Sequence, residues 1–91
     1  MNTQGAKGQR QETVEELIAS KQDGDWWIDE EQARLWIRIP GAGLTPWPYR
    51  DPLENGSCWR WDGNRDAPTL EPSLHLIGYW HGWLRNGALI S

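Results

Sequence analysis

Short runs of alternating apolar and polar residues fill the chain from Trp26 to its end. The run at residues 34–39 places three aliphatic side chains on one face of an extended segment, as a half-buried strand requires. Asn86-Gly87 lies between two such runs and is typical of a type I′ hairpin turn. The pattern predicts an α+β, mainly β fold: a small antiparallel sheet or partly open barrel of five to six short strands with one N-terminal helix. The expected strands are residues 26–28, 34–39, 57–61, 73–77, 80–85 and 88–90.

The N-terminal residues follow a different pattern. Residues 1–11 are polar, with no apolar periodicity, which predicts a disordered tail. Thr13 to Glu16 has the S/T-x-x-E form of a capping box and begins an apolar stripe at helical spacing, which predicts a helix at about residues 13–22. Residues 12–91 are expected to form a single small domain, because separate cores usually need roughly 100 residues each.

Tryptophan is the main large apolar residue, with eight Trp and no Phe in 91 residues. Each buried Trp removes roughly 150–250 Å² from water, but its N–H then needs a partner. We therefore expect two or three of them to be partly exposed. The best candidate is Trp47, because residues 45–56 contain three prolines and are expected to form a stiff irregular loop that also carries Tyr49.

The net charge of −4 is concentrated near the N-terminus. Residues 1–31 hold eight acidic and three basic side chains, and residues 32–91 hold five acidic and six basic ones. This distribution argues against direct nucleic-acid binding, which needs a basic surface. The acidic third is either a solvated face or a surface that meets a basic partner.

The single cysteine, Cys58, excludes a disulfide within the chain and fits a reducing compartment. The N-terminus lacks an apolar signal segment, and no window approaches the roughly 20 apolar residues of a membrane span. A cytoplasmic protein is expected.

Ligand spacing suggests two candidate metal sites. Asp62, Asn64 and Asp66 have the first three positions of a calcium loop, but Ala67 and Ser73 stand where the glycine and the bidentate glutamate belong. An Asx-turn, in which these side chains bond nearby backbone, is favoured. For zinc, the available ligands are Cys58, His75 and His81, which are too few for a structural site. No metal and no cofactor are predicted.

Cys58 and Ser73 are candidate nucleophiles. Cys58 with a histidine would form a dyad, and Ser73 shares a strand face with His75, two residues later. The sequence contains no G-x-S-x-G elbow and no mark of an oxyanion hole. No catalytic residue and no enzymatic activity are therefore predicted.

Aromatic and charged side chains instead suggest a binding surface, because Trp and Arg are enriched in interface hot spots. The predicted partner-binding residues are Trp36, Trp47, Tyr49, Arg50, Asp23, Asp25, Asp29, Glu30 and Glu31.

The segments W-R-W-D-G-N-R-D-A-P-T-L-E-P-S-L-H and Y-W-H-G-W-L-R-N-G resemble a family of small phage and prophage proteins of unknown function. The likeness covers roughly residues 57–90 and implies a shared fold. Many members have further cysteines that suggest zinc, but here Trp80 precedes His81 where those members have a cysteine. The residues taken as a fold signature are Trp59, Trp61, Asp62, Gly63, Asn64, Pro68, Thr69, Pro72, Ser73 and His81.

A phage context implies a non-enzymatic protein that binds and inhibits a host defence complex, of the anti-CRISPR type. Its partner would then be a host defence protein, with a basic nucleic-acid-binding surface as one option. Two alternatives stay open: a metal-binding protein or hydrolase that uses Cys58, His75 and His81, and a carbohydrate-binding or virion accessory module.

Overall fold

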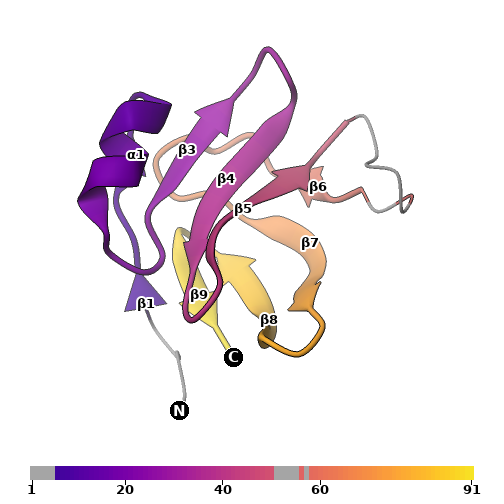
Figure 1. Cartoon of the computed structure of the whole chain (residues 1–91). Coiled ribbons are helices and arrows are strands. Elements are labelled where there is room, and N and C mark those ends of the chain that lie inside the picture. The colour runs from indigo at the N-terminus through magenta and orange to yellow at the C-terminus, as the bar shows by residue number, and fades with distance from the viewer. Residues whose placement is uncertain (1–5, 51–55, 57) are drawn as a thin grey trace.

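Two β-sheets and one helix make up the structure, a computed structural model that describes residues 6–50, 56 and 58–91. The first sheet has the strand order β1-β9-β8-β7-β6 and the second β2-β3-β4-β5. All neighbouring strands are antiparallel except β2 and β3, which are parallel. The elements are β1 (Ala6–Lys7), β2 (Arg10–Gln11), α1 (Val14–Ser20), β3 (Trp26–Asp29), β4 (Arg34–Ile39), β5 (Gly43–Pro48), β6 (Arg60–Trp61), β7 (Leu70–Leu76), β8 (Trp80–Arg85) and β9 (Ala88–Ile90) (Figure 1).

The core lies between the two sheets, because each presents its apolar face to the other. Alternation along β4 buries every second residue, as the sequence pattern predicts. Burying such a side chain fully is worth roughly 1.5–3 kcal/mol, and so the two layers hold together through these faces. The cluster consists of Trp26, Leu35, Ile37, Ile39 and Trp47 from the second sheet, and Leu70, Leu74, Leu84 and Leu89 from the first.

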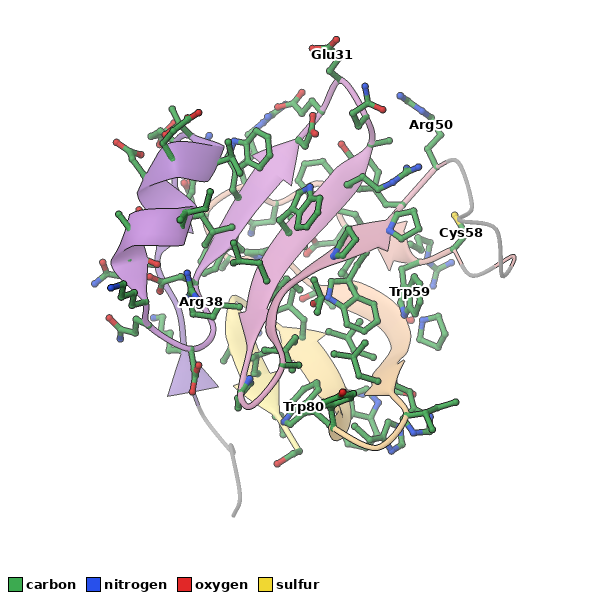
Figure 2. All side chains as sticks on the ribbon, in the orientation of Figure 1. Glu31, Arg38, Arg50, Cys58, Trp59 and Trp80 are labelled. Carbon is green, nitrogen blue, oxygen red and sulfur yellow. The ribbon has the colours of Figure 1, made fainter. Side chains whose placement is uncertain are left out.

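The helix α1 is shorter than predicted but begins at the predicted cap. Thr13 Oγ1 accepts a hydrogen bond from Glu16 N at 3.1 Å, and Glu16 Oε1 accepts one from Glu12 N at 2.8 Å, which confirms the capping box. Leu17 is fully buried. Arg38 of β4 donates to the carbonyl oxygen of Leu17 at 2.8 Å and so ties the end of the helix to the second sheet (Figure 2). The helix lies on the opposite side of the molecule from β6 (Figure 1).

Three predicted strands, at residues 34–39, 80–85 and 88–90, have the observed bounds. The Asn86-Gly87 turn between the last two has positive φ at both residues, 49° and 75°, as a type I′ turn requires. The mainly β fold with one helix is therefore confirmed, and the sheets do not close into a barrel.

Backbone pairing changes other predictions. Residues 6–7 and 10–11, expected in a disordered tail, extend the edges of the two sheets. The expected loop at residues 45–56 begins instead with the edge strand β5, where prolines are tolerated because no further strand needs their missing N–H. The predicted strand at 57–61 is described only as Arg60–Trp61, and Ser57 lies outside the described residues. The strand predicted at 73–77 begins at Leu70.

A methyl group at Gly82 is expected to destabilise the domain. A Cβ built there would overlap the carbonyl oxygen of Ile90 on β9 and the ring of Trp80. Because the obstructing oxygen belongs to a paired strand, Gly82→Ala should lower the free energy of unfolding by about 1–3 kcal/mol. Thermal unfolding followed by circular dichroism measures it. An unchanged midpoint would show that β8 and β9 separate easily enough to admit the methyl group.

Within the described residues, no helix has both the length and the hydrophobicity that a membrane crossing requires.

Candidate active site

The strand β7 is irregular where it passes β8. Leu70 pairs with Leu84 and Leu74 pairs with Gly82, so four steps along β7 match two steps along β8. Three residues of β7 thus lie between these pairs where β8 has one, and the excess of two makes a bulge between Leu70 and Leu74. Bulges re-aim side chains and are frequent beside active sites. This bulge contains Glu71, Pro72 and Ser73.

Ser73 and His81 meet across β7 and β8. Ser73 Oγ lies 3.1 Å from His81 Nε2, within the range of a nucleophile and its general base. Ser73 is half-buried and His81 is exposed, so a substrate can approach both atoms from solvent. The contact has the geometry of a serine nucleophile beside a general base.

The His81 imidazole has ring neighbours on both strands. His75, its partner in the register across β7 and β8, lies with a ring-centroid distance of 4.6 Å. Trp83, two residues along β8, lies at 5.6 Å. These contacts restrict rotation of the His81 ring. Within residues 6–50, 56 and 58–91, no carboxylate is bonded to His81.

The backbone of Ser73 is held from the side of β6. Trp59 Nε1 donates a hydrogen bond to the Ser73 carbonyl oxygen at 3.1 Å. The Trp59 ring in turn packs edge-on against Trp47, with ring centroids 4.8 Å apart, and Trp47 is a core residue. The candidate nucleophile is therefore connected to the rigid interior by direct contacts.

Comparison with known families gives a match over nearly the whole chain. A model of the BubE family, described as the bacterial ubiquitination-like system serine protease, matches residues 11–91. The chain belongs to the BubE family. No curated protein and no solved structure matches it significantly.

BubE membership corrects the functional prediction. The family is described as a serine protease, so the predicted non-enzymatic inhibitor of the anti-CRISPR type is wrong. Of the two alternatives, a hydrolase agrees in reaction class with the family's description, whereas a carbohydrate-binding or virion module does not. The roles of Cys58, His75 and His81 stay predictions. In the described residues, no three His, Cys, Asp or Glu side chains are grouped to hold a metal ion. The resemblance to small phage proteins stays a prediction.

Of the predicted partner-binding residues of this BubE chain, two are buried and the others are at least partly accessible. Trp47 and Asp25 are only 3% and 2% exposed, so neither can contact a partner. Trp47 Nε1 donates to Thr45 Oγ1 at 2.8 Å, which satisfies its N–H inside the core. Asp25 accepts hydrogen bonds from Gln9 N at 2.8 Å and from Gln11 Nε2 at 3.3 Å.

The other predicted partner-binding residues are at least partly accessible. Glu31 and Arg50 point into solvent (Figure 2). Tyr49 packs against Trp61, and burial raises the pKa of its phenol; the nearby Arg50 charge partly opposes this rise, and Asp29 adds a smaller one. Trp36 and Asp29 are half-buried, while Asp23 and Glu30 are exposed.

The loop that follows β6 forms the predicted Asx-turns. Asp62 Oδ1 accepts hydrogen bonds from Asn64 N at 3.0 Å and from Thr69 N at 3.2 Å. Asn64 Oδ1 accepts from Asp66 N and Ala67 N, both at 2.9 Å. The side chains that spacing offered to calcium therefore bond the local backbone, as the sequence predicts.

Sequence reasoning assigned Ser73 and His81 to the fold signature, and the structure brings them together in a pair. The sequence held part of the signal for this site, because Ser73 and His75 are two residues apart and so fall on the same face of a strand. What the sequence could not provide was the register that places His81 beside them.

Proposed function

We propose that the protein is a serine protease in which Ser73 is the nucleophile and His81 the general base. Its substrate would be a protein of a bacterial ubiquitination-like system, and its compartment the bacterial cytoplasm. The observation that carries the proposal is the 3.1 Å contact between Ser73 Oγ and His81 Nε2 on an accessible sheet face. The family match over residues 11–91 supports the reaction class.

The reaction follows from this contact. Ser73 Oγ attacks the substrate carbonyl carbon while its proton passes to His81 Nε2. His81 then gives the proton to the leaving amine as the C–N bond breaks, and the acyl group remains on Ser73 Oγ. A water molecule, deprotonated by His81, cleaves this ester and restores the Ser73 hydroxyl. His81 must begin with its proton on Nδ1, so that Nε2 can accept.

The rings beside His81 would act as positioning groups. An unrestrained imidazole on an exposed strand would visit several rotamers, and each departure would break the contact with Ser73. Packing against His75 and Trp83 favours the orientation in which Nε2 faces Ser73 Oγ. The benefit is one of geometry, since a small misplacement of reacting groups costs considerable rate.

Labelling with a fluorophosphonate probe tests the proposal. Such probes form an Oγ–P bond with an activated serine as fluoride leaves, so labelling reports on the nucleophile without a known substrate. Mass spectrometry of the labelled protein is expected to place the adduct on Ser73. His81→Ala should slow labelling by about 10²–10⁴-fold, the usual contribution of a general base.

Ser20→Ala is the matched control, because Ser20 Oγ bonds the carbonyl oxygen of Leu17 at the end of α1, away from the pair. It should label at the unchanged rate. An adduct on another serine, or no labelling at all, would refute the assignment of Ser73.

A further inference from the structure

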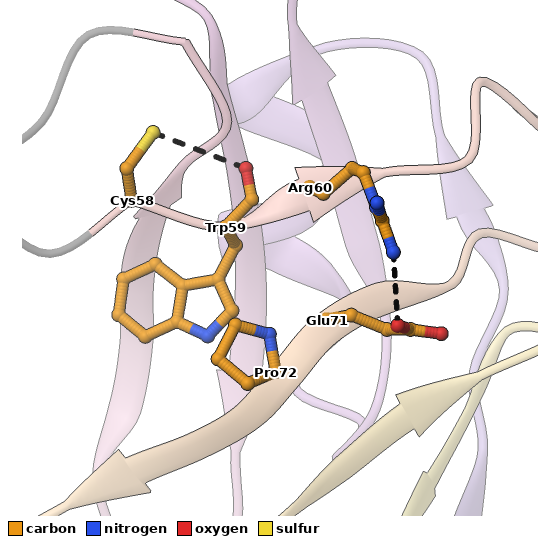
Figure 3. A pocket seen from close by; sticks show the side chains of 5 residues that line it. All are labelled: Cys58, Trp59, Arg60, Glu71 and Pro72. Carbon is orange, nitrogen blue, oxygen red and sulfur yellow. Dashed lines mark hydrogen bonds and ion pairs between the residues drawn. The ribbon is translucent and has the colours of Figure 1, made fainter.

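A pocket opens beside the bulge that carries Ser73. Its volume is about 430 Å³, and it is lined by Cys58, Trp59, Arg60, Glu71 and Pro72 (Figure 3). Two segments far apart in the sequence form it: the start of β6 with the residues before it, and the bulged part of β7. The pocket therefore exists only because β6 and β7 pair.

The pocket adjoins the candidate nucleophile. Pro72, one of its lining residues, directly precedes Ser73, and consecutive Cα atoms lie only about 3.8 Å apart in a trans peptide. Trp59, another lining residue, donates its indole N–H to the Ser73 carbonyl oxygen at 3.1 Å. A substrate group bonded to Ser73 Oγ would thus be within reach of this space.

The chemistry of the walls favours an apolar occupant. The Trp59 indole and the Pro72 ring lie close together on one side (Figure 3), and the indole N–H is already bonded. Arg60 and Glu71 form an ion pair at 3.2 Å with side chains 82% and 60% exposed. Because Arg60 and Glu71 pair with each other, neither is left free to pair with a charged substrate side chain.

The backbone beside the pocket is held by a side-chain contact. Of the described residues, β7 pairs with β6 only through Leu70 and Glu71. Beyond Glu71, the Ser73 carbonyl oxygen accepts the Trp59 indole N–H, and Pro72 has no N–H to donate. A substrate is therefore expected to be recognised here by a side chain in the pocket.

We infer that this pocket is the subsite for an apolar side chain on the residue whose carbonyl Ser73 attacks. The inference rests on the proposed protease function and adds a substrate preference to it. An aliphatic side chain that packs against Trp59 and Pro72 is removed from water. Glycine would leave the pocket empty, and a charged side chain would lose its hydration. A single well-filled hydrophobic pocket discriminates by roughly 10–200-fold.

Four small esters test the preference: the p-nitrophenyl esters of N-acetylated leucine, glycine, glutamate and lysine. Because the leaving group is activated, any acyl group can react, and the rates compare the acyl side chains alone. The leucine ester is expected to exceed the glycine ester in kcat/KM by about tenfold or more, and to exceed both charged esters. Hydrolysis by Ser73→Ala protein provides the background for each ester.

The native thiol allows the pocket to be closed without a mutation. Cys58 is exposed and is the one cysteine in the sequence, so a bulky fluorescein maleimide should attach there alone. The adduct should remove the advantage of the leucine ester and leave fluorophosphonate labelling of Ser73 within about twofold. Protein treated with maleimide that excess free thiol has already consumed should keep the preference.

A pair of tryptophan variants provides a second readout. Trp59 and Trp61 are both half-buried and pack against the core, but only Trp59 lines the pocket. Trp59→Ala should reduce the leucine preference, while Trp61→Ala should retain it.

The outcomes separate the two proposals. If Ser73 is labelled but untreated protein hydrolyses the leucine and glycine esters equally, or the maleimide leaves the preference intact, the pocket inference is overturned and the protease proposal stands. If Ser73 is not labelled and no ester reacts above background, both are overturned.

Discussion

Ser73→Ala is expected to lower kcat/KM for hydrolysis of the leucine ester by about 10⁴-fold or more, the scale of loss when a serine nucleophile is removed. The variant should fold normally. The Ser73 hydroxyl is half-buried, and its contact is with exposed His81, so its removal should change the free energy of unfolding by no more than about 0.5 kcal/mol. A steady-state assay and a thermal melt on the same preparation give both numbers.

The combination of lost activity and retained stability identifies a chemical role. A residue needed only for folding would lose both together. Ser20→Ala again provides the control, with unchanged ester hydrolysis. If Ser73→Ala protein retained more than about a tenth of the activity, the nucleophile would have to be sought elsewhere.

Trp47→Ala is expected to lower the free energy of unfolding by about 3–5 kcal/mol, the usual loss for a buried aromatic residue. Trp47 is 3% exposed, packs edge-on against Trp59 and sits in the core cluster. In a domain of this size such a loss lowers the midpoint of thermal unfolding by roughly 12–40 °C. Denaturant unfolding followed by far-UV circular dichroism measures the free energy.

Trp36→Ala is the matched comparison. Trp36 lies on β4, the strand that pairs with β5 through Leu35 and Trp47, but its side chain is only half-buried and it is not in the buried core cluster. Trp36→Ala should therefore lower the free energy of unfolding by clearly less than Trp47→Ala does. Equal losses of unfolding free energy from the two variants would show that side-chain burial does not determine how much each tryptophan stabilises the domain.

Local pattern predicted much of the fold because its physical basis is local. The capping box at Thr13 depends on atoms within four residues, and the Asn86-Gly87 turn depends on backbone angles that those two residues adopt readily. The alternation in residues 34–39 reports burial of one sheet face. Such features can be predicted without knowing which distant parts of the chain they contact.

The effect of a proline on a strand depends on the neighbouring strand. Pro46 and Pro48 are compatible with β5, since it lies at the edge of its sheet. Pro72 is compatible with β7, since it falls within the bulge between Leu70 and Leu74, where regular pairing is interrupted. Sequence shows a missing N–H but not whether a partner strand would have used it.

The sequence by itself determined the mainly β class, the helix cap, the last hairpin and the Asx-turns after β6, because each depends on neighbouring residues. It also placed Ser73 and His75 on one strand face. Only the tertiary structure decided that Trp47 is buried and that His81 reaches Ser73. Both depend on how separate strands align, and the bulge in β7 sets an alignment that no local spacing contains. Burial of Trp47 and the contact between Ser73 and His81 are both properties of strands brought together across the fold.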